Sequence, residues 1–156
     1  MWEKGDEYTV FDYRGLKFST PICFEDTFTT ICRKMVLNGS RCFINLSNDS
    51  WSKSTVCQKQ HLAMAVFRSV ENSVPSVRST ASGVTCIISP QGKIEKAAPE
   101  FCQAFIIGQL PLVEDDTENF YTRTGDWVGL ALALLTSFIL IMQTFVVIIK
   151  KIKNHI

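Results

Sequence analysis

A long apolar block near the C-terminal end constrains this chain more than any other feature. Residues 127–149 contain no charged side chain. As an α-helix the block would be roughly 34 Å long, and the hydrocarbon core of a bilayer is about 30 Å thick. A helix buried in a soluble core is the alternative, but such a helix is rarely apolar on every face over this length. We therefore predict a transmembrane helix over residues 127–149.

The charges on either side of the block predict its orientation. Residues 111–126 form an acidic linker with five carboxylates, opposed only by Arg123, and Lys150, Lys151 and Lys153 follow the block. Basic residues beside a span tend to stay in the cytoplasm. We therefore expect residues 150–156 to form a basic cytoplasmic tail. The preceding domain would lie outside the cytoplasm, which in a diderm bacterium is the periplasmic side of the inner membrane.

The rest of the chain has the composition of one ordinary soluble domain. The 156 residues carry a formal net charge of +1, which gives no reason to expect a nucleic-acid partner. Six cysteines occur without a Cys-x-x-Cys pair, and their spacings fit no small disulfide scaffold. With only two histidines as further ligands, we predict no metal site and no cofactor.

A cysteine stands where a predicted strand ends and a predicted helix begins. Residues 18–28 read FSTPICFEDTF, so Cys23 follows an apolar run and precedes Glu25 and Asp26. The partial positive charge of a helix N-terminus favours the thiolate form, which attacks carbonyl carbon. The alternative is an inert buried cysteine, since cysteine is among the most buried residue types. From these residues alone, both interpretations stay open.

Hydrophobic periodicity predicts an α/β order of elements over residues 1–110. A hairpin turn at residues 12–15 precedes the strand that leads to Cys23. The predicted helices cover residues 27–37, ended by Asn38-Gly39, and about 54–72, capped by Ser54 or Thr55 and ended by Pro75. The predicted strands cover residues 41–46, 77–80, 84–89, 94–97 and 105–110, with a turn at 90–93.

Four other side chains have a structural and a functional interpretation. Cys42 and Cys86 lie in predicted strands, and we predict that they are core residues. His61 lies beside the apolar stripe of the long helix, where a structural hydrogen-bonding role is favoured over catalysis. Trp51 closes the polar run 47–51, at the end of a strand, where sites of α/β proteins gather. A core position and a pocket wall are equally open for Trp51.

Several motifs occur in a recognisable order. The segments ICFED, NLSNDSW, QHLAMAVFRSVEN and VRSTASGVTCIISPQGKI resemble the second half of a nitrilase-superfamily (carbon-nitrogen hydrolase) domain, most closely in the bacterial apolipoprotein N-acyltransferase family. The resemblance covers roughly residues 8–126, and the apolar block resembles that family's last membrane helix. It implies an α/β fold: the second half of an αββα sandwich, followed by one C-terminal transmembrane helix.

The resemblance also implies a reaction and its residues. Cys23 would be the nucleophile that takes an acyl chain from a phospholipid as a thioester. The N-terminal amine of a diacylglyceryl lipoprotein would then accept the acyl chain. Glu25 matches the acidic residue after the family nucleophile and would support the site, and Trp51 matches a tryptophan beside the substrate. The expected partners are thus phospholipid, a lipoprotein acceptor and the membrane.

The departures from the family pattern concern the other catalytic groups. Nothing in residues 1–22 aligns with the glutamate base or the lysine that the resemblance implies. Trp51 is followed by Ser52-Lys53 instead of the usual Phe-Gly, and residues 81–84 read ASGV where the family has Asn-Gly-Val. We therefore expect the C-terminal part of such an enzyme, with a separate N-terminal half as a further partner. A membrane-anchored nitrilase-type amidase and a non-catalytic remnant or accessory half are the alternatives.

Overall fold

The computed structural model describes residues 5–113 and 119–153. The chain divides into two compact units, Met1–Arg123 and Thr124–Ile156. Most of the acidic residues of the predicted linker, in 114–118, and the end of the predicted basic tail, 154–156, lie outside the described residues.

A four-stranded sheet forms the centre of the first unit. Strands β3 (Phe43–Asn48) and β4 (Ser76–Ala81) are parallel, and β5 (Cys86–Ile88) and β6 (Ile94–Ala97) follow in antiparallel order, so the strand order is β3-β4-β5-β6. The parallel pair is joined by a helical crossover, as parallel strands require. The predicted strands are confirmed here, with bounds that differ by two residues or fewer.

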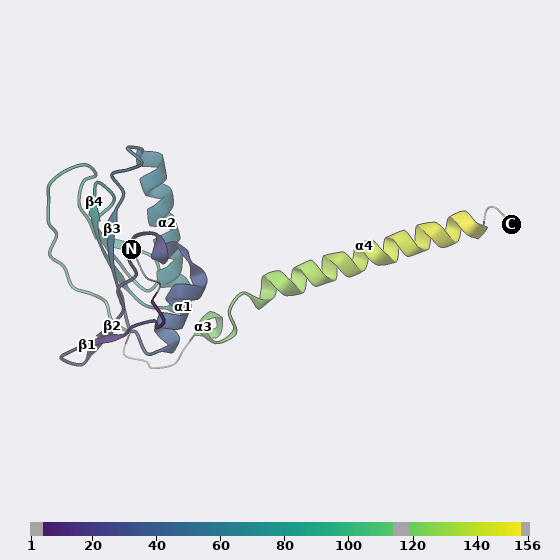
Figure 1. Ribbon diagram of the computed structural model, residues 1–156, viewed down its shortest axis with the longest axis horizontal. Helices are drawn as coiled ribbons and strands as arrows, with labels where there is room; N and C mark the ends of the chain where they lie inside the picture. Colours follow the sequence, from purple (N-terminus) through teal and green to yellow (C-terminus); the bar gives the residue numbers. More distant parts are fainter. Residues whose placement is uncertain (1–4, 114–118, 154–156) are drawn as a thin grey trace. The chain divides into compact units, whose positions relative to one another are not determined.

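Two helices cover one side of this sheet, α1 (Thr29–Leu37) and α2 (Thr55–Asn72) (Figure 1). Ser54 caps α2, because its hydroxyl accepts a hydrogen bond from the Cys57 amide at 3.4 Å. Ser73, with φ of 54°, ends α2 in the left-handed conformation typical of a helix C-terminus. Both predicted helices are thus confirmed, although α1 begins two residues later than predicted.

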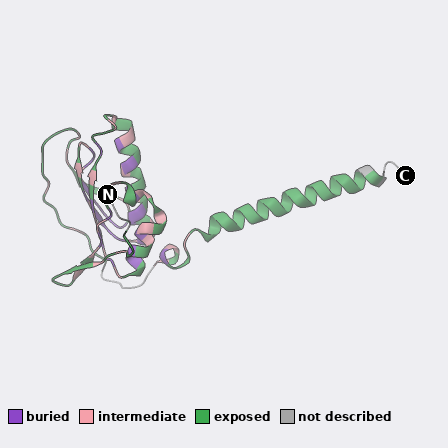
Figure 2. Ribbon diagram, in the orientation of Figure 1, coloured by how far each residue is buried: buried purple, intermediate pink, exposed green. Residues whose placement is uncertain are grey.

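The core lies between the helices and the sheet, where the buried faces of α1 and α2 meet the strands (Figure 2). One apolar cluster joins α1 to the start of β3, and a second joins α2 to β5. Cys42 and Cys86 are both 0% exposed, as predicted, although Cys42 immediately precedes β3 instead of lying within it. These two cysteines therefore contribute packing.

A separate hairpin leads into the sheet. Strands β1 (Phe11–Tyr13) and β2 (Leu16–Phe18) pair in antiparallel register across a turn at Arg14-Gly15. Both turn residues have positive φ, 53° and 86°, which matches the twist of a two-residue hairpin. The predicted hairpin is confirmed, although its turn is shorter than the predicted residues 12–15, because Asp12 and Tyr13 belong to β1.

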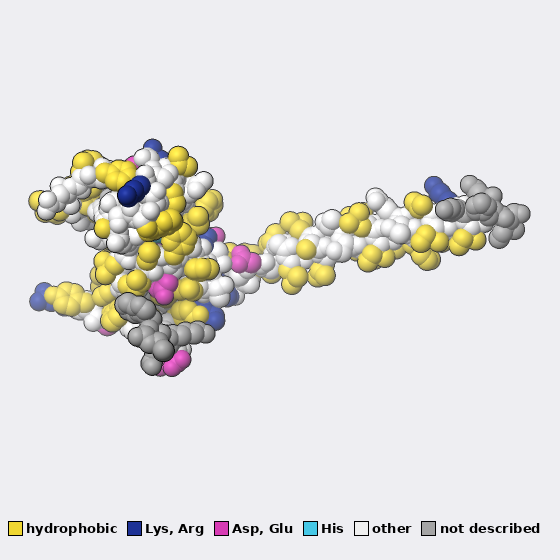
Figure 3. Space-filling view, turned by 45° about the horizontal axis from the view of Figure 1, so that its top comes forward, with side chains coloured by type: hydrophobic (Ala, Val, Ile, Leu, Met, Phe, Trp, Pro, Cys, Tyr) yellow, Lys and Arg dark blue, Asp and Glu magenta, His cyan; other side chains and the backbone are white. Residues whose placement is uncertain are grey.

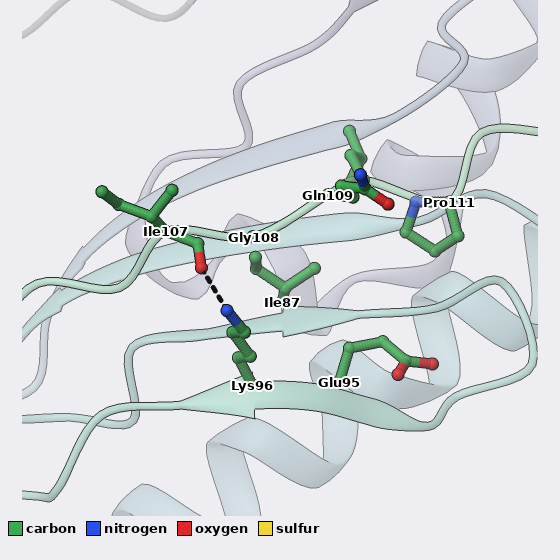
Figure 4. A pocket seen from close by; sticks show the side chains of 8 residues that line it. Ile87, Glu95, Lys96, Ile107, Gly108, Gln109 and Pro111 are labelled. Carbon is green, nitrogen blue, oxygen red and sulfur yellow. Dashed lines mark hydrogen bonds between the residues drawn. The ribbon is translucent and has the colours of Figure 1, made fainter.

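The strand predicted at residues 105–110 is wrong. Within the described part of the chain this segment is extended, but it pairs with no strand. It lies near β5 and β6, where the Lys96 ammonium donates to the Ile107 carbonyl at 2.6 Å (Figure 4). A Cβ atom on Gly108 would lie 2.6 Å from the Ile87 Cδ1 atom, so glycine permits this close approach. Phe105, Ile106 and Ile107 are residue types common in strands, but such residues do not specify a hydrogen-bonding partner.

A short helix, α3 (Phe120–Thr124), occupies part of the predicted linker. The Arg33 guanidinium donates to the Thr122 carbonyl at 2.7 Å, and the Asn119 amide donates to the Glu71 carbonyl at 2.6 Å. The residues just before the second unit are therefore attached to α1 and α2. This helix lies in a segment that was predicted to be a linker without secondary structure.

The second unit is dominated by one helix, α4 (Trp127–Lys153). Hydrophobic side chains follow it along the face visible in Figure 3. Over Trp127–Lys150 its mean hydropathy is 2.5 and none of its most apolar window is buried in protein. The helix begins at the predicted residue and is long and apolar enough to be a candidate membrane span.

Candidate active site

Cys23 occupies a sharp corner at the edge of the sheet. The preceding segment runs parallel to β3, with bridges between Ser19 and Phe43 and between Ile22 and Leu46. At Cys23 the backbone turns into the left-handed region, with φ of 51°, and the 3-10 helix η1 (Cys23–Thr27) begins. This conformation is uncommon for a residue other than glycine, and such residues cluster at functional sites. The predicted order of strand, corner and helix at Cys23 is confirmed.

Two polar side chains hold this corner in place. The Asn45 amide, on β3, donates to the Pro21 carbonyl at 3.0 Å and to the Cys23 carbonyl at 3.1 Å. The Glu25 carboxylate accepts from the Ile22 amide at 2.7 Å, as the third helical residue does in a capping box. These bonds offset the conformational cost of the corner, which is of order 1–3 kcal/mol for such backbone strain.

The Glu25 carboxylate therefore acts on the backbone immediately before the thiol. Its predicted supporting role stays a prediction, and the geometry gives it a physical form, since Glu25 fixes the orientation of the turn. Trp51, predicted beside the substrate, is 62% exposed in the turn after β3. Its ring centroid lies 6.2 Å from that of Phe24, the residue next to Cys23. Trp51 is thus a surface residue near the corner, and the core position that was one of its two interpretations is wrong.

The thiol itself is half-buried and has one hydrogen-bond partner among the residues that the structure describes. The Ser47 hydroxyl, on β3, lies 3.6 Å from the Cys23 sulfur. The same hydroxyl lies 2.7 Å from Asp49 Oδ1. Ser47 therefore connects the thiol to the side chains below it.

Those side chains form a buried ion cluster, defined here as Asp26, Asp49, His61 and Arg78. The His61 Nε2 atom lies 2.7 Å from Asp26 Oδ1, and Nδ1 lies 3.0 Å from Asp49 Oδ1. The Arg78 guanidinium lies 3.0 Å from Asp26 Oδ2 and 3.9 Å from Asp49 Oδ2. All four residues are at most 3% exposed. The cluster joins η1, the end of β3, α2 and β4 directly beneath the corner.

The geometry of the cluster sets the charge of His61. Burial by itself lowers the pKa of His61, but the hydrogen bond and charge of Asp26, with Asp49, outweigh burial and the charge of Arg78, so that the pKa is raised above 6.5. Both ring nitrogens face carboxylate oxygens, and only the imidazolium can donate from both. Two carboxylates then balance two cations, as a buried cluster requires. His61 is thus a structural hydrogen-bonder, as predicted.

The three fully sequestered cysteines differ from Cys23 in chemistry. Burial, with the nearby Asp26 charge, raises the pKa of Cys32 to about 12, and burial raises those of Cys42 and Cys86 to about 11. Near neutral pH these residues stay thiols, which are poor nucleophiles. Cys57 is half-buried in the first turn of α2, and Cys102 is exposed in a loop.

The residues that the sequence analysis missed are Asn45, Ser47, Asp49, Asp26 and Arg78. A polar residue among apolar neighbours in a strand is the pattern that could have identified Asn45, because a buried polar group needs a partner. Arg78 lies in the mostly polar strand SVRSTA, where no such contrast distinguishes it. No group of three or more His, Cys, Asp or Glu side chains within residues 5–113 and 119–153 has the arrangement of a metal site.

A cavity of about 790 Å³ adjoins the corner, with Ile22 and Glu25 in its wall. Its wall also includes apolar, acidic and hydroxyl side chains, among them Tyr8, Phe11, Ile31, Met35, Asp6, Glu7, Thr9 and Thr20. A second hollow, of about 770 Å³, lies between β5–β6 and the segment 107–111 (Figure 4). Only the first is lined by residues of the Cys23 corner.

Comparison with known proteins gives a consistent result. A family model described as "Carbon-nitrogen hydrolase" matches residues 1–115. Apolipoprotein N-acyltransferase 1 of Treponema pallidum (strain Nichols) is 44% identical over 141 residues, which cover 90% of this chain and 26% of that protein. The apolipoprotein N-acyltransferase of Geobacter metallireducens is 42% identical over 122 residues, which cover 78% of this chain and 23% of that protein. The chain thus spans about a quarter of the length of these relatives.

Among solved structures, the fold is similar to that of Saccharomyces cerevisiae Nit3, a member of branch 10 of the nitrilase superfamily. The TM-score is 0.51 at 22% identity, over 63% of this chain and 39% of that chain. Likeness at this identity concerns the fold alone. The predicted nitrilase-type α/β fold is confirmed.

Proposed function

The chain belongs to the carbon-nitrogen hydrolase family, and on this premise we propose that Cys23 is the nucleophile of an apolipoprotein N-acyltransferase. The observation that carries the proposal is the position of Cys23 at a strained corner, held from two sides by Asn45 and Glu25. The relatives that bear this name align with most of the chain, including the corner's surroundings. The raised pKa of the three buried cysteines argues against them as alternatives.

The proposed reaction is a two-step acyl transfer. The Cys23 thiolate attacks the acyl ester carbon of a phospholipid, so that a C–S bond forms, the ester C–O bond breaks, and the lysophospholipid leaves as an alcohol after taking up a proton. The N-terminal amine of a diacylglyceryl lipoprotein then attacks the thioester. An amide C–N bond forms, the C–S bond breaks, and the proton that the nitrogen loses passes to the departing thiolate, which restores the thiol.

The side chains that line the cavity beside the corner support the proposal of these two substrates. Phe11, Ile31 and Met35 offer an apolar wall suited to an acyl chain, and Asp6 and Glu7 offer negative charge to an ammonium group. In this proposal Trp51 lies at the edge of the substrate site, and Glu25 keeps the corner rigid.

The reaction needs groups beyond the thiol. A general base must accept the thiol's proton, and a positive group or donors must stabilise the oxyanion. We propose that the glutamate and the lysine implied by the family resemblance act from outside residues 1–156. The expected result is that the 156-residue chain in a bilayer transfers no measurable acyl group. Turnover at the rate of full-length relatives would contradict this.

The candidate span supports a membrane location for this chemistry. We propose that α4 crosses the bacterial inner membrane, with the preceding unit on the periplasmic side and Lys150 at the cytoplasmic end. A reporter that functions only in the cytoplasm, fused after Ile156, should be active. Activity of an export-dependent reporter at that position would reverse the orientation.

The nucleophile is tested in a chimera in which this chain replaces the matching segment of the Treponema pallidum relative. Cys23→Ser should abolish acyl transfer to a diacylglyceryl peptide, because a hydroxyl is far less ionised than a thiol near neutral pH. Cys42→Ser and Cys86→Ser are the matched controls, and they should retain transfer wherever the protein folds. Retained transfer in Cys23→Ser would exclude Cys23 as the nucleophile.

A further inference from the structure

The Ser47 hydroxyl stands between two groups that both accept hydrogen bonds. It lies 3.6 Å from the Cys23 sulfur and 2.7 Å from Asp49 Oδ1. A serine hydroxyl carries a single hydrogen, so it can donate to one of them at a time. While Cys23 is a thiol, the shorter bond to the Asp49 carboxylate holds this hydrogen, and a Ser47 lone pair faces the sulfur.

Loss of the thiol's proton changes which arrangement is stable. A thiolate has no hydrogen to donate and is stabilised by a donor, so a lone pair of Ser47 pointing at it is repulsive. Rotation of the hydroxyl about its C–O bond would direct its hydrogen to the sulfur. This rotation breaks no covalent bond and moves no proton between residues.

The ion cluster lets Asp49 release that hydrogen. The Asp49 carboxylate also receives a hydrogen bond from His61 Nδ1 at 3.0 Å, and the Arg78 guanidinium lies 3.9 Å from its other oxygen. Asp26 in turn holds the other side of His61, at 2.7 Å. Asp49 would therefore keep a charged donor after Ser47 turned away, so that no unpaired buried carboxylate results.

We propose that Ser47 is a positioning residue whose hydroxyl hydrogen moves from Asp49 to the Cys23 sulfur when the thiol ionises. This inference rests on the proposed role of Cys23 as a nucleophile, and it extends the site to a residue on β3. Ser47 stabilises the reactive form of the sulfur, and the Asp49–His61 pair controls how readily the hydroxyl is available.

The rate at which iodoacetamide alkylates Cys23 measures how far Ser47 stabilises the thiolate. The full 156-residue chain in detergent micelles is alkylated at neutral pH, and the rate at each cysteine is followed by peptide mass spectrometry. Cys102, exposed in a loop, is the internal reference. Ser47→Ala should slow alkylation of Cys23 by about tenfold, since hydrogen bonds to charged groups are among the stronger ones.

Two substitutions serve as controls for the Ser47→Ala result. Ser47→Thr keeps the hydroxyl at a strand position that accepts β-branched residues, and it should restore the Cys23 rate to within about twofold of the native rate. Ser50→Ala removes a hydroxyl in the turn after β3 that donates to Asn48 Oδ1 at 2.6 Å, and it should leave the Cys23 rate unchanged. A Ser47→Thr variant as slow as Ser47→Ala would overturn the proposal, because the hydroxyl would then not be the cause.

The competition for one hydrogen predicts an effect of opposite sign at Asp49. Asp49→Asn should raise the Cys23 rate a few-fold, because a neutral amide oxygen competes less strongly for the Ser47 hydrogen. In the Ser47→Ala background the same substitution should have no effect, as a double-mutant cycle would show. An equal rise in both backgrounds would mean that Asp49 acts through its charge alone, and would overturn the proposed coupling.

Alkylation needs no acyl donor, acceptor or base, so this test is independent of the proposed function. If Cys23 shows the expected pattern but is never acylated in the chimera, the acyltransferase proposal fails and the assignment of Ser47 stands. If acyl transfer requires Cys23 but Ser47→Ala alkylates at the native rate, the assignment of Ser47 fails alone.

Discussion

Cys23 and Asp26 stand three positions apart in η1, yet their surroundings are opposite. Cys23 is half-buried, has a left-handed backbone and has a polar contact with the Ser47 hydroxyl at 3.6 Å. Asp26 is 3% exposed and is bonded to both His61 and Arg78. One short helix thus presents a weakly restrained thiol on one side and anchors itself with charge on the other. The cluster therefore fixes the helix that carries the thiol, as the supporting contacts of a preorganised site do.

The largest effect should follow from removing the guanidinium of the cluster. Arg78→Met leaves two buried carboxylates with one imidazolium, and breaking a buried pair typically costs about 3–5 kcal/mol. The free energy of unfolding from denaturant titration would measure the loss. Lys93→Met, which breaks the exposed pair with Glu95 at 2.8 Å, is the matched control and should cost less than about 1 kcal/mol. An equal loss of unfolding free energy in the two variants would show that the buried cluster stabilises the fold no more than an exposed ion pair does.

The second largest effect should follow from filling the space between Gly83 and the Asp49 carboxylate of the cluster. Gly83 is buried, and a Cβ atom placed on it would collide with the Asp49 carboxylate. Gly83→Ala should therefore displace Asp49 and reduce the free energy of unfolding by about 1–3 kcal/mol, as overpacking usually does. Gly5→Ala is the control, because no atom lies within 4 Å of its added Cβ. A native stability in Gly83→Ala would contradict the tight packing at Asp49.

The pH dependence of stability tests the charge of His61. Its pKa is raised in the folded state, so its contribution is fully present below about pH 6.5 and is lost as the pH rises through the folded pKa. As the pH rises above about 6.5, the native chain should lose stability with a slope of up to about 1.4 kcal/mol per pH unit. His61→Asn should flatten this slope. An unchanged slope in the variant would assign the titration to another group.

The smallest effect isolates the backbone strain at the corner. Because Cys23 has φ of 51°, Cys23→Gly should be more stable than Cys23→Ala by about 1 kcal/mol. At Cys42, where φ is not positive, the order should reverse, with glycine less stable by about 0.5–1 kcal/mol. Calorimetric or denaturant midpoints of the four variants would give both differences. The same order at both positions would argue against strain at Cys23.

The sequence predicted the helices, most strands and the corner at Cys23 better than it predicted which side chains meet beneath that corner. Apolar periodicity and capping residues located α2, and the motif around Cys23 located the corner. Pairing partners were not predictable, because residues 105–110 begin with apolar residues typical of a strand, yet they lie near β5 and β6 without pairing as a strand. The family motif favoured Glu25 as the acid of the site, whereas Asp26 enters the buried cluster, since which of two adjacent carboxylates turns inward depends on the tertiary position of His61.

The central claim is that acyl groups are carried by Cys23 and by no other cysteine of the chain. It is tested most directly by incubating the chimera with phospholipid that carries a labelled acyl chain, quenching in acid and mapping the hydroxylamine-sensitive label by peptide mass spectrometry. We predict that the label lies on the peptide that contains Cys23, and that Cys57 and Cys102 stay unlabelled. Label on either of those two cysteines, or acyl transfer without any labelled cysteine, would contradict this account.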